Sequence, residues 1–133
     1  MKKGFAADIE TETLKNTDFR RVLYTGKNSQ LVLMSLKAGE EIGSEVHDTI
    51  DQFFRFEKGE GKVIIDGAAH AVKDGSAVIV PAGAEHNVIN TQTTADLKLY
   101  TIYSPPEHQD KTIHTTKAEA EAAHEHFDGK TTE

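Results

Sequence analysis

Short apolar runs, each closed by a turn signal, limit what this chain can fold into. Residues 30–37 form one such run, and further runs occupy 53–56, 77–80, 86–90 and 97–103. Two more runs flank Asp66-Gly67, a typical two-residue hairpin turn in which both positions take φ > 0. Because no helical pattern separates the runs, the sequence predicts an antiparallel all-β fold, a barrel or sandwich, and not a parallel βαβ sheet.

The two ends of the chain differ from this pattern. Residues 1–18 are polar and weakly patterned, and we expect a strand or an arm there. Residues 115–128 are predicted to be a helix, because Thr116 and Glu119 form a capping box, alanines follow, and Gly129 stands where a helix would stop. With 133 residues, we expect one domain over 1–133, with a barrel core at about 20–104 and the helix outside it.

Composition excludes several classes of function. The chain has no cysteine, which excludes disulfides, thiolate metal sites and a cysteine nucleophile. Its net charge of −7 argues against nucleic acid or an anionic membrane as partner, since both attract basic surfaces. The N-terminus begins like a secretion signal, but Asp8, Glu10 and Glu12 interrupt the place of the apolar run. We therefore expect no signal, no membrane span and a cytoplasmic location.

A five-residue pattern in the second half carries the sharpest chemical signal. Glycine, proline, glycine, histidine and asparagine are spaced as G-x5-P-x-G-x2-H-x3-N, at Gly75, Pro81, Gly83, His86 and Asn90. The proline and second glycine predict a tight turn that places His86 near the start of a strand. There an inward-facing ring nitrogen can reach a metal ion. We expect Asn90 to satisfy backbone groups where that strand ends.

The first half carries a related pattern. Gly39 is followed by Glu45, His47, Gln52 and Gly59 with the spacing G-x5-E-x-H-x4-Q-x6-G. Glu45 and His47 are two residues apart and so share one face of a strand. Both patterns resemble the motifs of single-domain cupins, whose first motif is G-x5-H-x-H-x3-4-E-x6-G. Glu45 replaces its first histidine, and Gln52 replaces its glutamate.

The resemblance implies a cupin jelly roll, or double-stranded β-helix, that holds one divalent metal ion. It implies His47 and His86 as ligands by residue type, and Glu45 and Gln52 by position. Such a donor set suits Mn²⁺, Fe²⁺, Ni²⁺ or Zn²⁺, and the sequence does not choose among them. It further implies a homodimer and an enzyme acting on a small oxygenated substrate, dioxygenase-like or isomerase-like. The alternative is a non-catalytic cupin that binds or senses a small molecule or metal.

Other readings of these and nearby residues stay open. Glu45 could be a solvated carboxylate at the rim, Gln52 a hydrogen-bonding amide beside the ligands, and Glu41 a substitute ligand of the same strand parity. Asp48 and Asp51 are interpreted as turn residues. His70, His108 and His114 are interpreted as surface residues, and the alternative for His108 and His114 is that they cover the mouth of the barrel. His124 and His126 are spaced wrongly for one helical metal site. The residues expected in the core are Met34, Phe54, Phe56, Val88 and Ile102.

Overall fold

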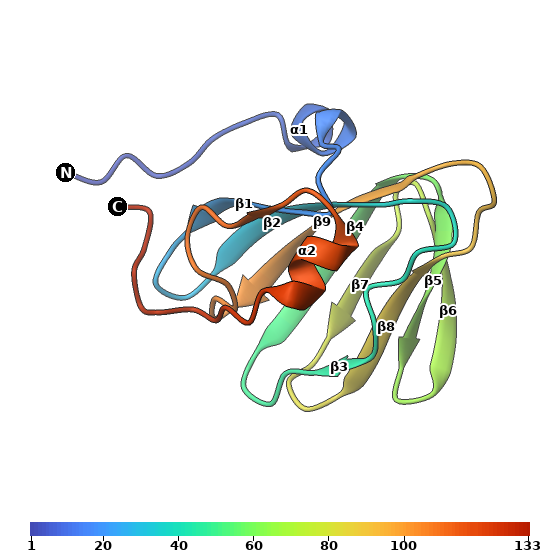
Figure 1. Ribbon diagram of the computed structural model, residues 1–133. Helices are drawn as coiled ribbons and strands as arrows, with labels where there is room; N and C mark the ends of the chain where they lie inside the picture. Colours follow the sequence, from blue (N-terminus) through green and yellow to red (C-terminus); the bar gives the residue numbers. More distant parts are fainter.

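Two antiparallel sheets form the body of the protein. The structure is a computed structural model that describes residues 1–133. The helices are α1 (Ile9–Lys15) and α2 (Lys117–Ala122), and the strands are β1 (Arg20–Thr25), β2 (Gln30–Leu36), β3 (Glu45–Val46), β4 (Asp51–Lys58), β5 (Glu60–Ile65), β6 (Ala68–Lys73), β7 (Ala77–Val80), β8 (Glu85–Asn90), β9 (Leu97–Ser104) and β10 (Ile113–His114). One sheet has the strand order β10-β1-β2-β9-β4-β7, and the other β3-β8-β5-β6. This is the predicted all-β jelly roll with a short C-terminal helix (Figure 1).

The core lies between the two sheets, where alternate residues of each strand meet. On β9, Leu97, Leu99, Thr101 and Tyr103 are all buried, whereas Ile102 is partly exposed. The predicted core position of Ile102 is therefore wrong, because strand alternation turns it to the outer face. The other four predicted core residues are fully buried: Met34, Phe54, Phe56 and Val88.

The Asp66-Gly67 hairpin has the predicted geometry. Both turn residues have positive φ, 44° at Asp66 and 84° at Gly67. The flanking strands β5 and β6 pair in register on either side, beginning with Ile65 opposite Ala68. The same aspartate also binds the neighbouring strand, since its side chain accepts a 2.8 Å hydrogen bond from the backbone N–H of Glu85 on β8. The turn thus helps fix the strand that carries His86.

The N-terminal segment contains a helix in place of the expected strand or arm. Asp8 caps α1 by accepting a 3.0 Å hydrogen bond from the backbone N–H of Thr11. Thr13 is fully buried, and the helix contacts β9 and β4. The helix is only seven residues long, too short for its periodicity to stand out in the sequence. Neither helix has the length and apolar character needed to cross a membrane.

The C-terminal helix begins where predicted but ends early. Thr116 accepts from the backbone N–H of Glu119 at 3.2 Å, and α2 stops at Ala122, so its extension to residue 128 is wrong. Beyond it the chain is held by tertiary contacts. Phe127 donates its backbone N–H to the carbonyl oxygen of Glu107 at 2.8 Å. Contacts with the 107–109 segment therefore override the helical preference of the sequence.

Asn90 closes the end of β8, as the motif predicted. Its side-chain N–H groups donate to the carbonyl oxygens of Leu36, Lys37 and Ala95 at 2.9–3.0 Å. Its side-chain oxygen accepts from the backbone N–H of Gln92 at 2.9 Å. The residue is almost fully buried, so these backbone groups depend on it for their hydrogen bonds.

We predict that Asn90→Ala lowers the free energy of unfolding by about 2–3 kcal/mol, because it leaves buried backbone groups without partners. Urea unfolding followed by circular dichroism measures the change. The control is Thr91→Ala, since Thr91 is exposed and makes one long hydrogen bond of 3.5 Å. We expect that control to stay within about 0.5 kcal/mol of the unsubstituted protein. Equal effects of the two substitutions would contradict the role assigned to Asn90.

Candidate metal centre

Strand pairing brings the first and second motifs together. Glu45 on β3 lies directly opposite His86 on β8 in an antiparallel register. His47 follows two residues after Glu45. The Pro81–Gly83 turn fixes its backbone, because Gly83 donates its N–H to the carbonyl oxygen of His47 at 2.9 Å. Gly83 has φ 89°, a conformation that favours glycine, which explains why the turn needs this residue.

Glu45, His47 and His86 form a compact group of ligating side chains. One ligand atom from each lies within 4.8 Å of the other two. Nε2 of His47 is 2.9 Å from Oε2 of Glu45, yet this buried nitrogen has no aligned hydrogen-bond partner. The rings of His47 and His86 are 5.4 Å apart between centroids. The geometry therefore converges three donors on one point, as a metal site requires.

His86 presents one ring nitrogen to this point. Its Nδ1 lies 3.3 Å from the carbonyl oxygen of Ala84, which assigns the proton to Nδ1 and the lone pair to Nε2. Burial lowers the pKa of His86, and the nearby His47 lowers it further. The ring is therefore neutral at pH 7, the form that binds metal ions.

Glu45 and His47 influence each other's charge. Burial raises the pKa of Glu45, but the adjacent His47 outweighs burial and holds the pKa below its ordinary value. Burial lowers the pKa of His47, but Glu45 outweighs it and the net pKa is raised. Each side chain therefore favours the charged form of the other. A metal ion that binds a ring nitrogen of His47 competes with a proton for it.

Gln52 is buried in the same part of the core. It lies on β4, opposite Val80 on β7 and Tyr103 on β9. Its Nε2 donates to Oγ1 of Thr101 at 3.0 Å, whereas its Oε1 is buried without any hydrogen-bond partner. An amide oxygen left free in a buried position has lone pairs that a divalent metal ion can accept. Phe54, of the same strand parity, has its ring 6.2 Å from that of His86 and supplies an apolar wall.

A second polar group adjoins the first, and sequence reasoning missed it. His108 places Nε2 3.3 Å from the hydroxyl of Tyr103 and Nδ1 2.6 Å from Oε1 of Glu125. The ring of Tyr103 packs edge-on against His47, with centroids 5.9 Å apart. Burial raises the pKa of Tyr103 well above its ordinary value, so its hydroxyl keeps its proton. The sequence did contain one indication of this group, because Tyr103 has the same strand parity as the core residues of β9 and therefore faces inward.

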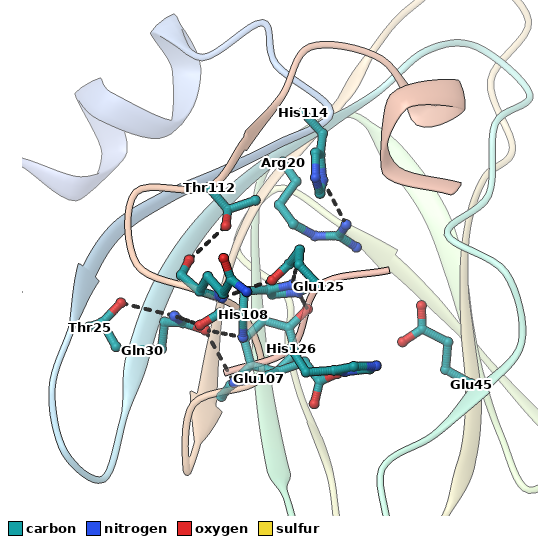
Figure 2. Close-up of polar contacts among 12 residues, drawn as sticks. Arg20, Thr25, Gln30, Glu45, Glu107, His108, Thr112, His114, Glu125 and His126 are labelled. Carbon is teal, nitrogen blue, oxygen red and sulfur yellow. Dashed lines mark hydrogen bonds and ion pairs between the residues drawn. The ribbon is translucent and has the colours of Figure 1, made fainter. Parts of the chain in front are cut away.

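Two of the histidines interpreted as surface residues are buried. His108 is only 7% exposed, and His114 only 8%. The reason is that each has a polar partner inside the protein: Glu125 for His108, and Arg20 for His114 at 3.2 Å (Figure 2). His70 is exposed, as expected.

The remaining acidic candidates and the last two histidines lie outside the ligand group. Glu41 is exposed and pairs through its backbone with Ile89. Asp51 stabilises the Pro81–Gly83 turn by accepting from the backbone N–H of Ala82 at 2.9 Å, in keeping with a turn role. His124 and His126 follow α2 and are not helical, and His126 lies 3.2 Å from Glu107.

An open cavity of about 410 Å³ gives access to the ligand group. Glu45 and His47 line it together with Arg20, Glu107, His108 and Glu125, and residues of α2 form its outer wall. Its size suits a small organic molecule. Two imidazoles, one carboxylate and a nearby free amide oxygen fit a divalent transition-metal ion, and the cavity leaves room for water or substrate beside it.

Comparisons with known proteins agree with this architecture. The family model described as a cupin domain (Cupin_2) matches residues 32–103. The uncharacterized protein YrkC of Bacillus subtilis (strain 168) is 49% identical over 91% of this chain and 68% of its own length. The uncharacterized protein L612 of Acanthamoeba polyphaga mimivirus is 44% identical over 78% of this chain and 67% of its own length. The crystal structure of BH2720 from Bacillus halodurans superposes with a TM-score of 0.88 at 46% identity, covering 91% of this chain and 96% of that one.

We predict that acid loosens the segment after α2. Burial raises the pKa of Glu125, but hydrogen bonds from His108 and the backbone N–H of Gln109 outweigh it, so the net pKa is lowered from 4.5. The carboxylate therefore stabilises the fold above the ordinary carboxyl pKa. That contribution is lost as the pH falls through the lowered value. Amide hydrogen exchange of residues 123–133, corrected for intrinsic rates, should rise as the pH falls below about 4.

Glu125→Gln should raise that exchange at pH 7, by about tenfold, because it removes a charge-assisted hydrogen bond. The matched control is Glu121→Gln, on the exposed face of α2, where the side chain is 68% exposed. This control should leave the exchange of residues 123–133 unchanged. An equal response of both variants would show that Glu125 does not hold the segment.

Proposed function

We propose that this chain, which belongs to the cupin family, is a metal-dependent enzyme that acts on a small oxygenated substrate. The activity we propose is dioxygenase-like or isomerase-like. One observation carries the proposal: the ligand atoms of Glu45, His47 and His86 converge within 4.8 Å beside an open cavity. The cavity leaves room beside the ligand atoms for water or a substrate, which a catalytic metal site requires.

The proposed ligands are Glu45, His47, Gln52 and His86. Two neutral imidazoles, one carboxylate and one amide oxygen leave a divalent ion with a net charge of about +1. Mn²⁺, Fe²⁺, Ni²⁺ and Zn²⁺ are all compatible with this donor set. When bound, such an ion supplies a Lewis acid that orients oxygen atoms of a substrate and stabilises negative charge on them.

The chain's own side chains shape the site around the proposed ligands. Phe54 limits water on the core side of the site through its packing near His86. The hydroxyl of Tyr103 is protonated and lies 3.3 Å from Nε2 of His108, which lines the cavity. The Glu125 carboxylate holds the ring of His108 in place through its Nδ1.

We expect the purified protein to bind one divalent ion per chain, and His86→Ala to lose most of it. The reason is that removing one of two imidazoles halves the nitrogen donors. Metal content by inductively coupled plasma mass spectrometry, on protein prepared without a histidine tag, measures the loss. His70→Ala is the matched control, because His70 is an exposed histidine on the β5–β6 hairpin. Full metal content in His86→Ala would overturn the metal-site proposal.

Two substitutions test whether Gln52 is a metal ligand or forms hydrogen bonds beside the ligands. Gln52→Glu should keep the metal, since it introduces the carboxylate usual in the family's first motif. Gln52→Ala should weaken metal binding if Gln52 is a ligand. Metal affinity equal to that of the unsubstituted protein would instead assign Gln52 to hydrogen bonding beside the ligands. Thr101, its partner at 3.0 Å, would then be the group that the amide serves.

Turnover is tested by incubating metal-loaded protein with small hydroxy, keto and phenolic compounds. Oxygen uptake with product formation would identify a dioxygenase-like enzyme, and product formation without oxygen uptake an isomerase-like one. His86→Ala serves as the inactive reference. Binding of compounds that are all recovered unchanged would favour the alternative, a non-catalytic binding or sensing cupin.

We also propose that the protein is a homodimer. The supporting observations are exposed apolar side chains on sheet edges, Ile79 on β7 and Ile113 on β10. Light scattering after size-exclusion chromatography should give twice the 14.6 kDa mass of one chain. A mass of one chain at every concentration would refute the dimer.

A further inference from the structure

Arg20 is a buried cation that forms no ion pair. It begins β1 and is only 7% exposed. Its one side-chain hydrogen bond runs from Nη1 to Nδ1 of His114 at 3.2 Å, and its Nε has no partner. Arg20 takes part in none of the ion pairs of the structure, so no carboxylate oxygen lies within 4 Å of a guanidinium nitrogen. A buried guanidinium whose N–H donors lack acceptors has lost the hydrogen bonds that water would give it, which costs free energy.

His114 does not neutralise Arg20. Its Nδ1 accepts the hydrogen bond from the guanidinium, so the ring must be neutral. Burial lowers the pKa of His114, and the charge of Arg20 lowers it further. The ring of Phe19 lies 5.5 Å from the guanidinium carbon and stabilises the cation without balancing its charge. Arg20 therefore keeps a full positive charge and free N–H donors.

The carboxylates of the same cavity have other partners. Glu45 faces His47 at 2.9 Å, and Glu125 accepts from His108 and from the backbone N–H of Gln109. Glu107 lies 3.2 Å from His126. These charges moderate the potential around Arg20 but occupy none of its donors. The guanidinium extends from β1 toward the side of the cavity on which Glu45 lies (Figure 2).

We propose that Arg20 binds the carboxylate group of the substrate, which is a small organic acid. This inference rests on the proposed function, because the same molecule would present its other oxygen atoms to the metal centre. Arg20, Glu45 and His47 line one cavity of about 410 Å³, large enough for an acid of a few carbon atoms. A guanidinium binds a carboxylate through two parallel N–H donors, which fixes orientation as well as charge.

The test compares each acid with its neutral primary amide. Glycolate, lactate and succinate, with glycolamide, lactamide and succinamide, are titrated calorimetrically into Mn²⁺-loaded protein. We expect at least one acid to bind about tenfold or more tightly than its amide. Arg20→Gln should abolish that preference while metal content stays the same. No preference in the unsubstituted protein, or an undiminished preference in Arg20→Gln, would overturn the proposal.

Two control variants show whether the acid preference depends on the place and shape of the Arg20 guanidinium or only on the positive charge of the protein. Arg21→Gln removes the same charge from the next residue of β1, whose side chain points outward and lies 3.5 Å from Asp18. It should leave the preference unchanged. Arg20→Lys keeps the charge but loses the paired donors, so the preference should fall to an intermediate value. If Arg20→Gln fails to fold, the test uses Arg20→Lys instead. An acid-over-amide preference in Arg20→Lys equal to that of the unsubstituted protein would refute the proposal.

Failure of the metal-site proposal can be distinguished from failure of the Arg20 proposal. If the unsubstituted protein takes up no metal, the proposed function fails, and the same titrations are made on metal-free protein. A preference for an acid that Arg20→Gln loses would still support carboxylate binding by Arg20. Absence of that preference would overturn it.

Discussion

The pairing of β3 with β8 is the contact on which the candidate site depends. β3 is only two residues long, so its ladder alone provides few hydrogen bonds. The Pro81–Gly83 turn reinforces it, because Gly83 binds the backbone of His47 and Ala82 binds the side chain of Asp51. The metal-ligand group is thus held by a turn rather than by a long strand. This explains why the motif needs glycine and proline at fixed distances from its histidine.

Much of the fold could be predicted because it is encoded locally. Strand alternation and turn residues identified the seven main runs, and the motif spacing identified Glu45, His47 and His86 as neighbours. The errors arose where tertiary contacts decided the structure. Ile102 lies in an apolar run in which strand alternation, and not hydrophobicity, decides which side chains face the core. The helix α2 ends shortly before the following chain contacts the 107–109 segment.

The part of the site that the sequence did not reveal comes from distant segments. Arg20 precedes both motifs, and Tyr103, His108 and Glu125 follow them, with no regular spacing among the four. Each is a common residue that is interpreted as surface or core unless its partner is known. Only the fold brings His108 between Tyr103 and Glu125, and His114 opposite Arg20 in the β1–β10 register. Motifs thus located the ligands, whereas the cavity around them required the structure.

The cavity also explains why the end of the chain is not helical beyond α2. A helix continued to residue 128 would leave the buried His108 ring without the carboxylate that binds its Nδ1, and would withdraw Phe127 from the Glu107 carbonyl. Leaving such buried polar groups unpaired costs more than the few tenths of a kcal/mol per residue that helix propensity contributes. The polar lining of the cavity and the extended course of the last residues are therefore consequences of the same hydrogen bonds. A site whose wall is formed this way depends on residues 123–127 as much as on the motif that carries its ligands.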